Sequence, residues 1–216
     1  MNSKTRISLI HATSVAIQPI NESFRRLWPD ATVYNLLEDS LTADLERAGG
    51  DIMVMAHRFS ALVRYSRDTG ADGILFTCSS FGPAVEAARA SIDVPVLKPN
   101  EAMIDEALGI GRKIALVATF QPALEPIMQE FDELASGIEF NPIFVEGALA
   151  ALKAGDQETH DQLIAEACAL ASQSDVVCFA QFSMTSAHAA AEAAARRPTL
   201  TTTDSAVKSL KKRLSR

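Results

Sequence analysis

The feature that most constrains the fold of this chain is an internal repeat. The segment ADGILFTCSSFG, residues 71–82, aligns without gaps with SDVVCFAQFSMT, residues 174–185. Further on, VPVLKPNEAMI, residues 94–104, aligns with RPTLTTTDSAV, residues 197–207, at the same offset of 103 residues. A constant offset over two separate segments indicates that the chain contains two copies of one half-domain.

Short apolar runs alternate with longer segments of helical periodicity in both copies. Runs such as GILF, IALV and VVCF are typical of strands covered on both faces, as in a parallel sheet. The expected strands are residues 7–10, 31–36, 73–76 and 94–97, then 114–118, 139–145, 176–180 and 199–200. The expected helices are residues 51–69, 82–91, 100–109, 123–135, 157–172, 186–196 and 205–214.

This alternation predicts an α/β fold with two pseudo-symmetric lobes, each a roughly four-stranded parallel sheet flanked by helices. We expect residues 1–97 to form the first lobe and residues 98–204 the second. The C-terminal helix, residues 205–216, is expected to pack back on the first lobe. Ligands of open parallel sheets bind beyond the carboxyl ends of the strands, so we expect the active site in the cleft between the lobes.

Composition excludes several classes of protein. The 216 residues are 48% hydrophobic and 22% charged, which is ordinary for a globular protein, and the net charge of −7 argues against nucleic-acid binding. No apolar run approaches the roughly 20 residues of a membrane span, and ISLI near the N-terminus is too short for a secretory signal. Three cysteines without framework spacing predict reduced thiols in a cytoplasmic protein. No metal-binding motif is present, so we expect no metal site.

The residues that follow the expected strands carry mainly hydroxyl, amide and basic groups, and we find no acidic side chain among them. Such an edge favours an anionic ligand, and we expect a small carboxylate substrate held by hydroxyls and backbone amides. The residues that we predict to bind it are Thr13, Ser79, Ser80, Lys98, Thr119, Phe120, Gln181 and Ser183. The hydroxyl residues also suit a capping role, and a lysine at such a position is often simply solvated.

Cys78 is the main candidate for chemistry. It follows the strand GILFT and precedes an expected helix, whose N-terminus would stabilise a thiolate. A buried structural cysteine is the alternative, and position alone does not decide between the two. Cys168, in an Ala-rich helix, and Cys178, within a strand, are expected in the core.

His11 ends the first strand and is the second catalytic candidate. It would act as an ion-pair partner of Cys78, as a second acid/base, or as a ligand for the carboxylate. The alternative is a partly buried histidine that bonds only to backbone groups. His188, just after Gln181, is a weaker candidate.

The segments FTCSSFG, ISLIHATS, IALVATF and SDVVCFAQFSM resemble the aspartate/glutamate/hydantoin racemase superfamily, which has arylmalonate decarboxylase-like members. The resemblance covers essentially the whole chain. It implies catalysis without a cofactor: one thiolate removes a proton α to a carboxylate, and an opposite thiol returns one. It also implies a homo-oligomer, most often a dimer.

The chain departs from this pattern at Gln181, which the repeat aligns with Cys78 and which stands where the family has a second cysteine. Glutamine has no proton to exchange, but it can orient a carboxylate or stabilise an enolate. Because racemisation is the common activity of the superfamily, we expect a racemase- or epimerase-like isomerase with one catalytic cysteine, although a decarboxylase better fits the lost thiol. The alternatives are a decarboxylase of malonate-like acids, a Cys/His hydrolase and a non-catalytic ligand-binding homologue. In single-cysteine decarboxylases of this superfamily the retained cysteine lies in the second half, so this chain is the mirror case.

Overall fold

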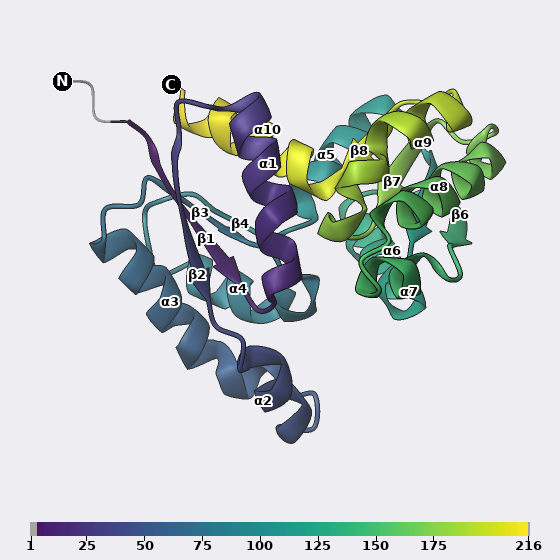
Figure 1. Ribbon diagram of the computed structural model, residues 1–216. Coiled ribbons are helices and arrows are strands. Elements are labelled where there is room, and N and C mark those ends of the chain that lie inside the picture. Colours follow the sequence, from purple (N-terminus) through teal and green to yellow (C-terminus); the bar gives the residue numbers. More distant parts are fainter. Residues whose placement is uncertain (1–3, 216) are drawn as a thin grey trace. The chain divides into compact units, whose positions relative to one another are not determined.

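The computed structural model describes residues 4–215, which fold into two compact units (Figure 1). Unit 1 comprises Met1–Pro99 and Ala206–Arg216, and unit 2 comprises Asn100–Ser205. The division falls two residues after the predicted boundary at residue 97 and one residue after the predicted boundary at residue 204. We describe each unit by itself.

Unit 1 contains a four-stranded parallel sheet of order β2-β1-β3-β4. Its strands are β1 (Arg6–His11), β2 (Thr32–Leu37), β3 (Gly73–Phe76) and β4 (Val96–Leu97). Its helices are α1 (Ile17–Leu27), α2 (Leu41–Arg47), α3 (Ala56–Asp68) and α4 (Gly82–Arg89), together with α10 (Thr202–Leu214) from Ala206 onward.

Helices cover both faces of this sheet, as its continuous apolar strands require. On one face, Phe59 and Val63 of α3 and Val85 of α4 form a core cluster with alternate strand residues. On the other face α10 comes close to β3 at Gly73, where an added Cβ would lie 3.0 Å from the side chain of Leu214. Glycine at this position therefore lets α10 pack directly against the strand.

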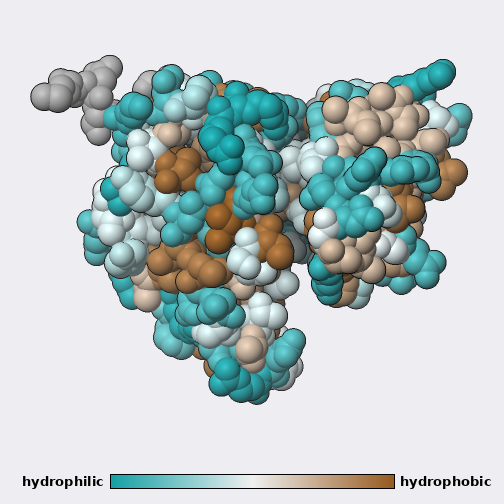
Figure 2. Space-filling view, in the orientation of Figure 1, coloured by the Kyte–Doolittle hydropathy of each residue, from teal (hydrophilic) through white to brown (hydrophobic). Residues whose placement is uncertain are grey.

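Unit 2 repeats the arrangement, with a parallel sheet of order β6-β5-β7-β8. Its strands are β5 (Lys113–Ala118), β6 (Glu139–Phe144), β7 (Val176–Phe179) and β8 (Thr199–Thr201). Its helices are α5 (Glu101–Ile110), α6 (Leu124–Leu134), α7 (Ala148–Lys153), α8 (Gln157–Cys168) and α9 (His188–Ala195). Helices α5 and α6 pack on one face, and α7, α8 and α9 lie on the other. In Figure 2 the surface around α9 is pale brown, in keeping with its sequence HAAAEAAA.

The two sheets confirm the predicted fold class. Strands β3 and β7, like β4 and β8, begin 103 residues apart, which is the offset of the sequence repeat. Strands β1 and β5, like β2 and β6, begin 107 residues apart. Unit 1 is therefore four residues longer between its second and third strands, in the segment that carries α2.

Three helices were not expected from the sequence: α1, α2 and α7. Helices α2 and α7 are seven and six residues long, too short to show a clear period of 3.6 residues. Helix α1 contains Pro19, which normally interrupts a helix; here it lies in the first turn, where its missing N–H has no intrahelical partner. The expected strand at residues 94–97 is reduced to Val96–Leu97, after Pro95. Among the described residues, no helix combines the length and apolar character needed to cross a bilayer.

An ion-pair network holds the segment between β2 and α3, which carries α2, against α3. The guanidinium of Arg58 donates to the carboxylates of Glu38 and Asp44 and, at 2.8 Å, to the hydroxyl of Ser40. Hydrogen bonds from Arg58 hold the pKa of Asp44 below its ordinary value. Burial alone raises the pKa of Glu38, but hydrogen bonds from Ser40 and Arg58 outweigh it and lower the pKa. Both carboxylates therefore stabilise the fold in their charged form.

We expect Arg58→Met to lower the free energy of unfolding by about 1 kcal/mol near pH 7, because two neighbouring carboxylates lose their shared counter-charge. The difference from the wild type should shrink below about pH 3, because carboxyls with lowered pKa values stabilise the fold only where they are ionised. Urea unfolding at the two pH values measures both effects. Arg47→Met is the control, because Arg47 is 74% exposed and pairs only with Asp44 among the described residues. Equal losses at both pH values would contradict the electrostatic explanation.

Candidate active site

The central strands of unit 1 bring His11 and Cys78 to the same edge of the sheet. In the parallel pairing of β1 with β3, Ile10 lies opposite Phe76, and the N–H of Thr77 donates to the Ile10 carbonyl at 3.0 Å. His11 is therefore level with Thr77, and Cys78 lies one residue further along. Both residues stand at the carboxyl edge, where parallel sheets bind their ligands.

Cys78 is a partly exposed thiol at the start of a helical segment. Its backbone is extended (φ −123°, ψ 123°), and it caps the 3-10 helix Ser79–Phe81, which runs directly into α4. Its side chain packs at the border of the core cluster that contains Phe76 and Phe81. The thiol thus combines a position ahead of a helix with access to solvent.

The other two cysteines are core residues, as predicted. Cys168 and Cys178 are both 0% exposed. Burial raises the pKa of the Cys168 thiol to about 12, and burial together with the charge of Glu106 raises that of Cys178 even further. Neither forms a thiolate at neutral pH, so Cys78 is the one cysteine of the three that is accessible for chemistry.

The structure does not bring the ring of His11 to Cys78. Successive residues of an extended strand point to opposite faces of the sheet, and His11 and Thr77 share one face while Cys78 lies on the other. His11 Nδ1 is 2.8 Å from the hydroxyl of Thr77, and Nε2 is 3.0 Å from Oδ1 of Asn35. Both ring nitrogens are therefore occupied. The alternative of a partly buried histidine that bonds only to backbone does not match this arrangement, because the ring is fully buried and both of its partners are side chains.

His11 is also held in its neutral form. The side chain is 0% exposed, and this burial lowers its pKa below the ordinary 6.5, although the hydrogen bond with Asn35 acts in the opposite direction. Asn35 in turn donates to Asn21 Oδ1 at 3.4 Å, so its Oδ1 accepts from His11 Nε2. A neutral His11 fixes Thr77, the residue before the thiol. Nothing in the sequence pointed to Asn35, because it comes from the neighbouring strand β2.

Gln181 occupies the place of Cys78 in unit 2. It lies two residues after β7, as Cys78 lies two residues after β3, and its backbone is also extended (φ −141°, ψ 143°) ahead of a 3-10 helix. Its Oε1 accepts two hydrogen bonds from Thr119, one from the backbone N–H at 2.7 Å and one from the hydroxyl at 3.1 Å. The donors of Thr119 that we expected to bind a substrate carboxylate are thus taken up by Gln181. The amide Nε2 of Gln181 remains as a donor in this lobe.

The remaining predicted binding residues have different surroundings. Thr13 and Ser80 are exposed, and Ser79 and Ser183 are partly buried. Phe120 is 50% exposed. Lys98 is 24% exposed, and its Nζ is 3.7 Å from a carboxylate oxygen of Glu86 on α4, so its charge is already partly balanced. The weaker candidate His188 has its Nε2 2.7 Å from the carbonyl of Thr199, a structural contact.

The prediction that no acidic residue follows a strand was wrong. Glu38 comes directly after β2, and its backbone N–H donates to the carbonyl of His11 at 2.9 Å. The exposed Glu146 lies two residues after β6. Both residues are visible in the sequence, in LLEDS and in FVEGA. The carboxylate of Glu38 is paired with Arg58, so the strand end is not left with an uncompensated negative charge. Among the described residues, no group of three or more His, Cys, Asp or Glu side chains is arranged to hold a metal ion.

Comparison with known proteins assigns the family. The model of the Asp/Glu/Hydantoin racemase family matches residues 9–210, almost the whole chain. The chain belongs to this family. The match confirms the resemblance stated from the sequence motifs. No curated protein sequence matches the chain significantly.

Solved structures with the same fold include racemases and a decarboxylase. Allantoin racemase from Klebsiella pneumoniae is 17% identical, with a TM-score of 0.74 over 98% of this chain and 88% of that one. A glutamate racemase from Bacillus anthracis is 10% identical, with a TM-score of 0.71 over 99% and 83%. Unliganded arylmalonate decarboxylase is 16% identical, with a TM-score of 0.65 over 96% and 92%. These likenesses establish the fold of the chain.

The lowered pKa of His11 predicts a specific dependence of stability on pH. The unfolded chain takes up a proton near pH 6.5 more readily than the folded protein does, so stability is retained above pH 6.5 and is lost as the pH falls below it. For one proton the slope is at most about 1.4 kcal/mol per pH unit. We expect His11→Gln to reduce this slope in urea unfolding between about pH 5 and 7. His57→Gln, at an exposed position, is the control for replacing a histidine by glutamine.

The burial of the cysteines predicts selective labelling. In the native protein, iodoacetamide should modify Cys78 alone, and Cys78→Ser should abolish the rapid phase, because the other two thiols are fully buried and protonated. Mass spectrometry of peptides from native and denatured samples measures the extent at each site. Labelling of Cys168 or Cys178 at a rate similar to that of Cys78 would contradict this assignment.

Proposed function

We propose that this protein is a cofactor-independent isomerase, a racemase or epimerase that moves a proton at the α-carbon of a small carboxylate or hydantoin-like substrate. The observation that carries the proposal is the position of Cys78. It is the accessible thiol of the chain, at the carboxyl end of a central strand and ahead of a helix, in a protein of the Asp/Glu/hydantoin racemase family.

Cys78 is the acid/base in this proposal. Its thiolate takes the α-proton of the substrate and becomes a thiol, while the electron pair of the C–H bond moves into the carboxylate or imide to form an enolate. A solvent water, in place of a second thiol, gives a proton to the opposite face of the α-carbon, and this yields the other stereoisomer; the thiol of Cys78 then loses its proton to solvent. Backbone amides at the start of the helical segment after Cys78 are suited to stabilise the negative oxygen of the enolate.

Gln181 favours decarboxylation as a second candidate. A racemase needs a proton donor for each face of the substrate, and the position equivalent to Cys78 carries an amide with no proton to exchange. In decarboxylation of a malonate-like acid, the bond to one carboxylate breaks, carbon dioxide leaves, and the thiol of Cys78 protonates the enolate on one face. One thiol is sufficient for that reaction. The fold shared with arylmalonate decarboxylase is compatible with it.

The structure gives no support to a Cys/His hydrolase. That mechanism needs an imidazole that takes the proton of the nucleophilic thiol. Both ring nitrogens of His11 instead bind Thr77 and Asn35, on the other face of the sheet from Cys78. We therefore assign His11 to holding the strand end rather than to acid–base chemistry.

Exchange with solvent deuterium tests the function. Incubation of aspartate, glutamate, hydantoins and substituted malonates in deuterated water should give deuterium at the α-carbon of at least one compound, measured by proton NMR. Retention of every carboxylate identifies an isomerase, and release of carbon dioxide identifies a decarboxylase. We expect Cys78→Ser to reduce the rate by about 10²–10⁴-fold. Unchanged exchange in this variant would exclude Cys78 as the acid/base.

The aligned positions of Cys78 and Gln181 predict the effect of a second thiol. If isomerisation is limited by the missing donor, Gln181→Cys should raise the rate of racemisation by about tenfold or more, because it supplies an exchangeable proton at the equivalent strand end. Circular dichroism of an optically pure substrate follows the change. Gln181→Ser is the matched control, since it also removes the bond to Thr119 but adds no thiol. Equal rates in the two variants would contradict the two-thiol explanation.

A further inference from the structure

We propose that a groove in unit 2 binds an aromatic substituent of the carboxylate ligand. The groove has a volume of about 390 Å³ and lies where β5 and β6 end. We call it the Phe120–Phe144 groove; its principal lining residues are Phe120, Pro122, Phe144, Leu149, Ala150 and Lys153. The inference rests on the proposed function in taking the bound carboxylate to be a substrate.

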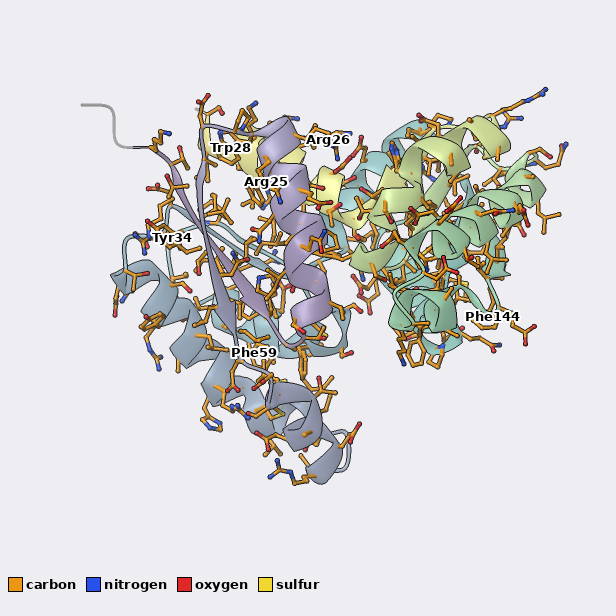
Figure 3. All side chains as sticks on the ribbon, viewed as in Figure 1. Arg25, Arg26, Trp28, Tyr34, Phe59 and Phe144 are labelled. Carbon is orange, nitrogen blue, oxygen red and sulfur yellow. The ribbon has the colours of Figure 1, made fainter. Side chains whose placement is uncertain are left out.

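The two phenylalanines of the groove are unusually exposed. Phe120 is 50% exposed and Phe144 is 43% exposed, in a chain with only 6% aromatic residues. Phe144 is the last residue of β6, and Figure 3 places it at the same edge of unit 2 as α7 in Figure 1. Both rings therefore lie at the carboxyl edge of the sheet, where ligands of parallel sheets bind.

A neighbouring aromatic residue on the same strand shows that the exposure is local. Phe140 and Phe144 are four residues apart on β6 and so point to the same face of the sheet. Phe140 packs against Phe131 of α6, with ring centroids 5.8 Å apart. Phe144 lies beyond this contact and lines the open groove instead. The fold thus covers one ring of the pair and leaves the other available to a ligand.

The repeat gives an independent indication that this edge is built for apolar contact. Aligned through β5 and β1, Phe144 corresponds to Leu37 and Pro122 to Val15. Leu37 is 42% exposed and Val15 is 63% exposed. Both sheets therefore present apolar side chains at equivalent places of their carboxyl edges. Of these positions only Phe144 is aromatic, and Phe120 corresponds by the same offset to Thr13.

The charge of the groove indicates which group the ligand carries besides its ring. Its lining includes Lys153 and no acidic residue, and Lys153 forms no ion pair within the described part of the chain. An apolar wall beside an uncompensated cation suits a molecule with a flat ring and a carboxylate. The volume lies within the range of small-molecule sites, and a ring bound in the groove would remove apolar surface of the ligand and of the lining from water.

Ligand binding tests the groove separately from catalysis. Isothermal titration with phenylacetate and with glutarate compares an aryl with an aliphatic acid. We expect phenylacetate to bind at least about tenfold more tightly, and Phe144→Ala to remove most of that preference. Lys153→Gln should weaken the binding of both acids. Leu134→Ala is the matched control, because Leu134 is 58% exposed in the same unit and does not line the groove.

The outcomes separate this inference from the proposed function. Selective binding of phenylacetate that depends on Phe144, with no α-deuteration of any acid, would uphold the groove and overturn the proposed chemistry. Deuteration of aliphatic acids without any preference for aryl acids would uphold the proposed chemistry and overturn the groove. If Phe144→Ala leaves phenylacetate binding unchanged but alters the molar mass in sedimentation, the groove is a contact between copies of the chain and the inference fails.

Discussion

The parallel pairing of the two central strands in each unit is the interaction on which the candidate site depends. Backbone hydrogen bonds between β1 and β3 align Ile10 with Phe76, so that His11 and Thr77 emerge side by side and Cys78 follows. The same pairing of β5 with β7 aligns Val117 with Phe179 and places Thr119 next to Gln181. Helices on both faces exclude solvent from these strands, so that only the strand ends are exposed.

Because side chains alternate along a strand, His11 and Cys78 lie on opposite faces of the sheet and have different surroundings. His11 and Thr77 point into one layer of unit 1, where burial keeps the imidazole neutral and its hydrogen bonds satisfied. Cys78 turns to the other layer, where it reaches the surface at the start of a helical segment. A shift of β3 by one residue would move Thr77 and Cys78 to the opposite faces of the sheet and bury the thiol. The buried histidine is thus part of what fixes the strand end.

The two copies have kept one architecture and changed their strand ends. In unit 2 the thiol is replaced by an amide whose oxygen binds both donors of Thr119. That arrangement satisfies polar groups internally that an approaching carboxylate would otherwise bind. In the same unit Phe120 follows β5 and Phe144 ends β6. We therefore propose a reactive thiol in unit 1 and an apolar ligand groove in unit 2.

The sequence by itself determined the repeat, the two parallel sheets, seven of the helices and the family, and it made Cys78 the candidate for chemistry. These follow from patterns that are local or that recur at a fixed offset, such as GILF and VVCF. The tertiary structure decided the neighbours of each candidate. That Asn35 and Thr77 would occupy both nitrogens of His11, and Gln181 the donors of Thr119, depended on contacts between residues 24 to 66 positions apart. Such contacts are fixed by strand order and register, which no local pattern encodes.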